Sequence, residues 1–123
     1  MPPTPGHAVH TKRIYDPSGP DDGRRILVDR IWPRGITKDR AGLDEWCREV
    51  APSTALRKWF GHDASCWAEF LRRYEAELEG NERFDALVEE VRAGSITLLY
   101  SARDIDHNQA VALAGFLEDR LKR

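Results

Sequence analysis

Two short, continuous apolar runs constrain the fold of this chain more than any other feature. The first is the apolar centre, residues 26–28, of the segment RRILVDRIW at residues 24–32, and the second lies in the segment SITLLYSA at residues 95–102. Uninterrupted apolar runs of this length, rich in aliphatic and β-branched side chains, are typical of strands that are buried on both faces of a parallel sheet. Each run leads into a polar loop and then into a helical pattern, so the sequence predicts βα units.

The fold class expected from this arrangement is α/β: a small, mostly parallel, Rossmann-like sheet of about three to four strands flanked by helices. An edge strand is expected at residues 9–15, where VHTKRIY alternates in part, and a surface turn at residues 16–23. Helices are predicted for residues 42–50, 65–80, 84–94 and 108–122 from apolar side chains that recur every three or four positions, and for residues 53–61 from a cap and a closing glycine.

Local signals define the ends of several predicted helices. Leu43, Trp46 and Val50 share one face of the first helix, and the proline at position 52 ends it. Ser53 or Thr54 caps the second helix, and a glycine follows it. In the last helix, the inward face is expected to carry the side chains of Val111, Ala114, Leu117 and Leu121.

The chain has 123 residues, which suits one α/β domain at residues 9–123 after a poorly ordered tail at residues 1–8. A hydrophobic fraction of 41% and a charged fraction of 33% are typical of a globular protein. No apolar run is long enough to span a bilayer, and the amino end resembles no secretion signal. We therefore expect a cytoplasmic protein without a membrane partner, either a monomer or a homodimer.

The net charge and the cysteines indicate which partners and which bound groups are to be expected. A formal net charge of −2 gives little reason to expect nucleic-acid binding, although a local basic patch would change that expectation. Cys47 and Cys66 both lie in predicted helices, so they are expected to be free thiols in or near the core, with a disulfide as the alternative. The histidines lack the spacing of metal ligands, so we expect no structural zinc.

Two polar loops follow the two buried strands. In open parallel sheets, ligands bind outside the carboxyl ends of the strands, so the loops at residues 29–35 and 101–108 are expected to converge on one crevice. Arg30 and Arg34 offer planar guanidinium groups that match carboxylate or phosphate geometry. Trp32 is able to stack on a planar ligand. Asp29 either acts as an acid or base or pairs with a neighbouring arginine.

A structural explanation of the first loop stays open beside this one. Asp29 and Arg30 would then form an internal ion pair at the end of the strand, and Trp32 would belong to the core. No glycine-rich phosphate loop accompanies these residues, so a dinucleotide or Walker-type site is not expected, and no cofactor is predicted.

The second loop ends at the last helix. Asp106 and Gln109 have the spacing of a capping box, which makes Asp106 the expected N-cap and puts His107 in the first turn. A neutral imidazole beside two arginines would serve as a general base, or the residue is a surface histidine without a role. Ser101 and Asn108 are expected to bind the ligand, with free backbone N–H groups at the helix start.

A third polar cluster, RKWFGHD at residues 57–63, surrounds the end of the second helix. Gly61 is expected to take the left-handed conformation that ends a helix. Trp59 and Phe60 are interpreted as core residues, with a surface that stacks on a ligand as the alternative. His62 and Asp63 alone are too few ligands for a metal site.

The segments LVDRIWPRG, APSTALRKWFGHD and TLLYSARDIDHNQAV are long and distinctive. With them the chain resembles the YeaO-like branch of the family called domain of unknown function 488, from about His10 to Leu121. The resemblance implies a small bacterial cytoplasmic α/β protein of uncharacterised function. Longer relatives have a VDVR strand end, which Val28 and Asp29 match in part, and a following Pro-Arg, which Pro33 and Arg34 match.

The same relatives carry a Cys-His-Arg triplet at the start of the last helix. This chain has Asn108, Gln109 and Ala110 at these positions, with His107 before them. Thiol chemistry of the longer relatives therefore does not transfer to this chain.

Two functions remain open at this point. The first is a site for a small anionic ligand that resembles phosphate or a nucleotide, in a protein that is either a hydrolase or a transferase or binds the ligand only. In this site Asp29 or His107 would act as acid or base, and Arg30 and Arg34 would clamp the anion. The second is a non-enzymatic regulator or interaction module that docks a partner through the tryptophan-rich segment from Trp46 to Trp67.

Overall fold

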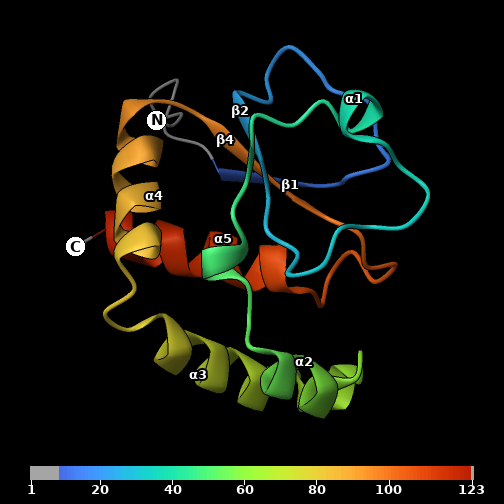
Figure 1. Cartoon of the computed structure of the whole chain (residues 1–123). Coiled ribbons are helices and arrows are strands. Elements are labelled where there is room, and N and C mark those ends of the chain that lie inside the picture. Colours follow the sequence, from blue (N-terminus) through green and yellow to red (C-terminus); the bar gives the residue numbers. More distant parts are fainter. Residues whose placement is uncertain (1–8, 123) are drawn as a thin grey trace.

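The computed structural model describes residues 9–122 and shows a four-stranded, all-parallel sheet with helices around it (Figure 1). The strands are β1 (Val9–Arg13), β2 (Arg24–Leu27), β3 (Glu45–Trp46) and β4 (Ile96–Tyr100), in the order β1-β4-β2-β3. The expected α/β class is confirmed. The predicted tail at residues 1–8 lies outside the described residues.

Strands β2 and β4, the two apolar runs of the sequence, lie side by side and run in the same direction. Leu27 pairs with Leu99, and the Val28 N–H donates to the Leu99 carbonyl at 3.0 Å. All five residues of β4 are buried, as expected for a strand covered on both faces. Within residues 9–122, strand β1 pairs with β4 alone and forms one edge of the sheet, which confirms the predicted edge strand.

Four helices contribute to the larger core on one face of the sheet: α2 (Thr54–Phe60), α3 (Trp67–Leu78), α4 (Glu82–Ala93) and α5 (Gln109–Leu121). In Figure 1, α5 and α4 lie close to the strands, and α2 and α3 form a layer farther out. Ile26, Val28, Leu98 and Tyr100 point from the sheet into this core. None of the helices in the described part of the chain is long and apolar enough to cross a membrane.

The other face of the sheet is covered by the segment at residues 32–46, which includes the short helix α1 (Lys38–Ala41). Ile14, Leu27 and Leu99 pack there against half-buried side chains of this segment. A buried ion pair lies on the same side of the molecule: Arg25 Nη1 is 2.6 Å from Asp22 Oδ2. A charged pair with this little exposure needs each group to be fully hydrogen-bonded.

The predicted helix at residues 42–50 is wrong. This segment forms strand β3 and a 3-10 turn at Arg48–Val50. The Asp44 N–H donates to the Arg25 carbonyl and the Cys47 N–H donates to the Leu27 carbonyl, both at 2.8 Å. Pairing with β2 satisfies backbone groups that a helix would have satisfied internally, so tertiary contact outweighs the local pattern.

The side chains of this segment divide between the two cores. Leu43 and Trp46 pack in the smaller core, whereas Cys47 and Val50 are buried in the larger one. The opposite burial of the adjacent Trp46 and Cys47 is the alternation of an extended chain, although the spacing of Leu43, Trp46 and Val50 imitates a helix. Cys47 and Cys66 are both free, as expected, but Cys47 lies just after a strand and not in a helix.

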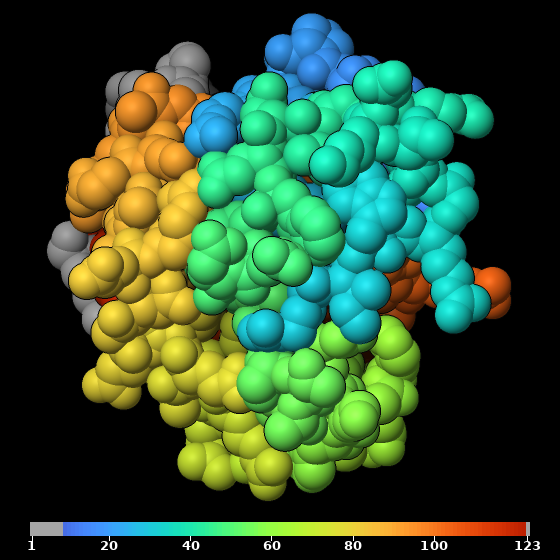
Figure 2. All heavy atoms as spheres, in the orientation of Figure 1, coloured from blue at the N-terminus to red at the C-terminus, as the bar shows by residue number. Residues whose placement is uncertain are grey.

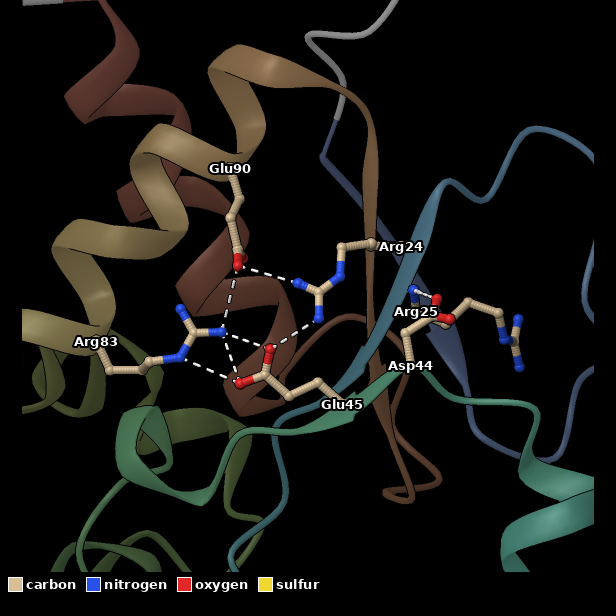
Figure 3. Close-up of polar contacts among 6 residues, drawn as sticks. All are labelled: Arg24, Arg25, Asp44, Glu45, Arg83 and Glu90. Atoms are coloured by element: carbon tan, nitrogen blue, oxygen red, sulfur yellow. Dashed lines mark hydrogen bonds and ion pairs between the residues drawn. The ribbon is translucent and has the colours of Figure 1, made fainter.

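An ion-pair network joins β2, β3 and α4 (Figure 3). Arg83 Nη2 is 2.5 Å from Glu45 Oε1, and Arg24 reaches both Glu45 and Glu90 at 3.1 and 3.0 Å. The network holds the two-residue strand β3 against the helix that covers it, in a region where the strand itself supplies few backbone hydrogen bonds.

The inward face of α5 differs in part from the expectation. Ala114 and Leu117 are buried as predicted, and Leu113 is completely buried although it was not assigned to this face. Val111 and Leu121 are only partly buried. The helix lies directly against β1 and β4, so a broader stripe of it is covered than a three-to-four spacing identifies.

Candidate functional site

A cleft of about 870 Å³ opens at the carboxyl ends of β2 and β4. Its walls are the loop after β2, helix α2 with the turn that follows it, and the loop between β4 and α5. In Figure 2 these segments meet at the surface on the right of the view, the first in blue to cyan, α2 in green and the third in orange. Ligands of open parallel sheets bind at this edge.

The structure brings all seven residues proposed from the sequence to this cleft. They are Asp29, Arg30, Trp32, Arg34, Ser101, His107 and Asn108. The expectation that the two loops converge is therefore correct in its geometry. The sequence treated residues 57–63 as a separate cluster, yet Arg57, Lys58, Phe60 and His62 line the same cleft.

Asp29 lies at the floor of the cleft, with 7% of its surface exposed. Ser101 Oγ donates to Asp29 Oδ2 at 2.5 Å, and Gln109 Nε2 donates to Asp29 Oδ1. Burial raises the pKa of Asp29 above its usual value, and the hydrogen bonds from Ser101 oppose that shift. Gln109 was not identified as a site residue, because only the fold brings it within reach of a residue 80 positions away.

Arg30 forms no ion pair with Asp29, contrary to the structural alternative drawn from the sequence. Its Nε donates to the Pro52 carbonyl at 2.9 Å and its Nη2 donates to the Ala51 carbonyl at 3.1 Å. The arginine thus satisfies backbone acceptors just before α2 and holds that segment against the strand end. Its positive charge is not neutralised by these carbonyls.

Trp32 is half-buried and held in place. Its Nε1 donates to the Ile36 carbonyl at 2.9 Å, and its ring meets Trp46 edge-on with 5.3 Å between the ring centroids. The side chain therefore belongs to the smaller core and also borders the cleft. Arg34 is exposed, and its carbonyl accepts a hydrogen bond from the Tyr15 hydroxyl at 2.8 Å.

His107 lies before α5 and not in its first turn. Asp104 Oδ1 accepts from the N–H groups of Asp106 and His107, and Asp104 Oδ2 is 3.0 Å from His107 Nδ1. These hydrogen bonds, the one from the Asp106 N–H first, lower the pKa of Asp104. The ionised carboxylate orients the imidazole, whose ring meets Trp67 edge-on at 5.2 Å.

Asn108, not Asp106, is the N-cap of α5. Asn108 Oδ1 accepts from the Val111 N–H at 3.0 Å, and its Nδ2 donates to the Asp104 carbonyl at 2.9 Å. The Asp106 N–H is already bound by Asp104, so the chain is still turning at Asp106 and the helix begins three positions later. The predicted capping box is therefore wrong.

The end of α2 places His62 at the cleft. Gly61 has φ 53° and His62 has φ 59°, so two consecutive residues take the left-handed conformation. Glycine adopts it freely, whereas for histidine it is uncommon. Gly61 ends the helix as predicted, and the same turn brings an exposed imidazole to the cleft.

The four tryptophans do not form one exposed face. Trp32, Trp46 and Trp67 are half-buried, and Trp59 is 39% exposed, with the Arg73 guanidinium 4.0 Å from its ring centroid. Trp46 Nε1 also donates to the Asp29 carbonyl at 2.7 Å. In the segment from Trp46 to Trp67, which was expected to dock a partner, most of the indole surface is therefore packed inside the protein.

The charges around the cleft are strongly unequal. Five permanent cations line it, on all three of its walls: Arg30, Arg34, Arg57, Lys58 and Arg103. Its carboxylates are Asp29 and Asp104. Within residues 9–122, none of the five cations lies within ion-pair distance of a carboxylate. In a chain of net charge −2 this is a local excess of positive charge.

Comparison with known proteins gives one family and several relatives. The family model described as "Inactive DUF488-N3 subclade" matches residues 8–123. The chain is 44% identical to "Uncharacterized protein YeaO" of Escherichia coli (strain K12) over 110 residues, which are 89% of this chain and 96% of that protein. It is 38% identical over 112 residues to "Uncharacterized protein Rv3073c" of Mycobacterium tuberculosis (strain ATCC 25618 / H37Rv), covering 91% and 95% of the two chains. No solved structure matches the chain.

Proposed function

The chain belongs to the DUF488 family, in the subclade described as inactive, and from this premise we propose that it is a cytoplasmic protein that binds a small anionic ligand without transforming it. The observation that carries the proposal is the set of five unpaired cations around a cleft with two carboxylates. Cations brought together without partners repel one another, and an anion in the cleft relieves that repulsion.

The positions of the cations also support an anion site. Arg30 and Arg34 come from the loop after β2, Arg57 and Lys58 from α2, and Arg103 from the loop after β4. A ligand in the cleft would therefore be contacted from three sides. Arginine suits this task, because its guanidinium forms paired hydrogen bonds to phosphate or carboxylate oxygens.

The two candidate catalytic residues are each engaged with other partners. Asp29 accepts hydrogen bonds from Ser101 and Gln109, and His107 is bound to Asp104. Among the described residues, no hydrogen bond links Asp29 to His107 and none links Ser101 to His107, so these three side chains do not form a serine–histidine–aspartate triad. This agrees with a binding role and with the description of the subclade as inactive.

Calorimetry and thermal-shift measurements with inorganic phosphate and pyrophosphate would test this function. We expect both anions to raise the melting temperature of the wild-type protein, with affinities that fall as sodium chloride is added. Arg34→Ala should weaken binding about tenfold, the effect of losing one charge-assisted contact. Arg92→Ala is the matched control, since Arg92 is an exposed arginine on α4 that does not line the cleft.

Two results would contradict the proposal. The first is that neither anion binds, or that Arg34→Ala and Arg92→Ala weaken binding equally. The second is turnover: if phosphorus NMR shows that the protein converts pyrophosphate or a phosphate ester at an enzymatic rate, then the chain is a hydrolase or transferase and not a binding protein.

A further inference from the structure

We infer that the ligand has two unlike ends and is a phosphorylated nucleoside, bound with its phosphate at the rim of the cleft and its uncharged end at the floor. This inference rests on the proposed function, to which it adds the chemical class and the orientation of the ligand. It follows from how charge, hydrogen-bonding groups and aromatic surface are distributed with depth in the cleft.

The cations lie mainly at the rim. Arg34, Arg57, Lys58 and Arg103 are all exposed, whereas Arg30 is half-buried and uses part of its guanidinium on backbone carbonyls. Exposed cations in solvent hold the charged end of a ligand near the surface. The phosphate is therefore expected at the mouth of the cleft, where it stays partly hydrated and avoids the full cost of desolvation.

The floor has the opposite character. Asp29 and Asn108 are buried there, with 7% and 2% of their surface exposed, and the half-buried Ser101 and Gln109 lie beside them. Among the described residues, the hydrogen-bond donors to the Asp29 side chain are the neutral groups of Ser101 and Gln109, and the positive charge of Arg57 acts on Asp29 without a hydrogen bond. An anion placed here would face a carboxylate across a short distance in a poorly solvated region, which is unfavourable.

A donor-bearing, uncharged group fits the same floor. A carboxylate has about four acceptor positions on its two oxygens, and the Ser101 hydroxyl, the Ser101 backbone and the Gln109 amide do not fill all of them. The remaining positions favour the O–H groups of a sugar or the N–H groups of a base. Asp29, held in place by Ser101 and Gln109, therefore favours an uncharged hydrogen-bond donor at the floor, whereas the cations at the rim favour a negatively charged group.

Aromatic surface also borders the cleft. The half-buried Trp32 lines it, whereas Phe60 and Phe70, also in its lining, are only 6% and 2% exposed and are stacked on each other with 4.4 Å between ring centroids. The face of an indole suits a planar ring better than a polyol. The cleft volume of about 870 Å³ also exceeds what inorganic phosphate fills and lies in the range of sites that enclose larger organic ligands.

The test measures binding to the wild-type protein by calorimetry for inorganic phosphate, adenosine, ribose 5-phosphate and each of the four nucleoside 5′-monophosphates. At least one nucleotide should bind at least about tenfold more tightly than phosphate, adenosine or ribose 5-phosphate. If phosphate binds and no nucleotide binds more tightly, the inference is overturned while the proposed function stands. If nothing binds, both fail. Ribose 5-phosphate equal to the best nucleotide would overturn the role of the base.

Orientation is tested separately by nitrogen-15 NMR of the wild-type protein. The side-chain amide signal of Gln109 should shift with the nucleotide and not with inorganic phosphate, because phosphate alone stays at the rim. The variant Asp29→Asn should weaken nucleotide binding about tenfold and leave phosphate affinity equal or higher. Equal losses for both probes, or a Gln109 signal that responds to phosphate alone, would overturn the proposed orientation.

Discussion

At the scale of single residues, Asp22 shows what a buried carboxylate costs and contributes in this fold. It is 5% exposed and accepts from Lys12 Nζ at 2.8 Å, from the Gly19 N–H at 3.1 Å and from Arg25 Nη1 at 2.6 Å. Burial by itself would raise the pKa of Asp22, but these hydrogen bonds lower it to about 2. The native state therefore strongly favours the ionised carboxylate.

The variant Asp22→Asn should lower the free energy of unfolding by roughly 3 kcal/mol near pH 7, because it leaves Arg25 charged and buried without its partner. The pKa of Asp22 is lower in the folded than in the unfolded chain, so its stabilising contribution is present above about pH 4 and is lost as the pH falls towards 2. Urea unfolding of both proteins at several pH values measures this difference.

Asp21→Asn is the control for that comparison, because Asp21 is the exposed neighbour of Asp22. It should change stability by less than about 0.5 kcal/mol. A gap between wild type and Asp22→Asn that stays constant from pH 7 to pH 2 would show that the ion pair is not the source of the stability.

At the scale of elements, the start of α5 depends on a cap that the sequence pattern misplaced. Asn108→Ala removes the acceptor of the Val111 N–H and the donor to the Asp104 carbonyl, and Asn108 is 2% exposed. We expect a loss of about 2 kcal/mol in the free energy of unfolding, near the upper end for N-cap residues, because both partners are left without a hydrogen bond. Chemical denaturation followed by circular dichroism measures it.

Asp106→Ala separates the two caps. Asp106 is exposed and its side chain caps nothing in α5, so this variant should stay within about 0.5 kcal/mol of the wild type. If Asp106→Ala proves more destabilising than Asn108→Ala, the capping box of the sequence pattern would be reinstated.

Strand β3 is a second element that the sequence pattern did not predict correctly. A strand of two residues is too short for the alternation by which strands are recognised, and its neighbours at Leu43 and Val50 complete a helix-like spacing. The extended conformation is favoured by tertiary contacts, among them the carbonyl partners on β2 and the ion pair of Arg83 with Glu45. Helices α3 to α5 were predicted more accurately, because each repeats its period over two or more turns, and α2 was predicted from its cap and its closing glycine.

At the scale of the whole molecule, Cys47 reports on global unfolding. It is completely buried between the sheet and the helices, and burial raises its pKa to about 11. In the variant Cys66→Ser, labelling of the remaining thiol by a disulfide reagent should be at least about a thousandfold slower than in urea, because reaction requires the core to open.

The complementary variant Cys47→Ala provides the comparison, since Cys66 is only half-buried. Under native conditions, the Cys66 thiol in Cys47→Ala should react faster than the Cys47 thiol in Cys66→Ser. Rapid labelling of Cys47 in a fully folded Cys66→Ser protein would indicate local opening at the end of β3 that does not involve the whole core.

The sequence by itself determined the elements whose signal is local. The two apolar runs gave the buried parallel strands, and the position of their following loops gave the carboxyl edge as the place where Asp29, Arg34 and Ser101 meet. Strand burial and sheet direction follow from composition and order along the chain, so they are visible without coordinates.

Only the tertiary structure decided which side chains complete the cleft and what each one contacts. Ser101 and Gln109 reach Asp29 from 72 and 80 positions away, and α2 adds Arg57 and Lys58 to a wall that sequence spacing did not connect with the strands. Contacts over such separations depend on how helices pack on the sheet, and packing satisfies the buried polar groups of the whole molecule together, which no local pattern encodes.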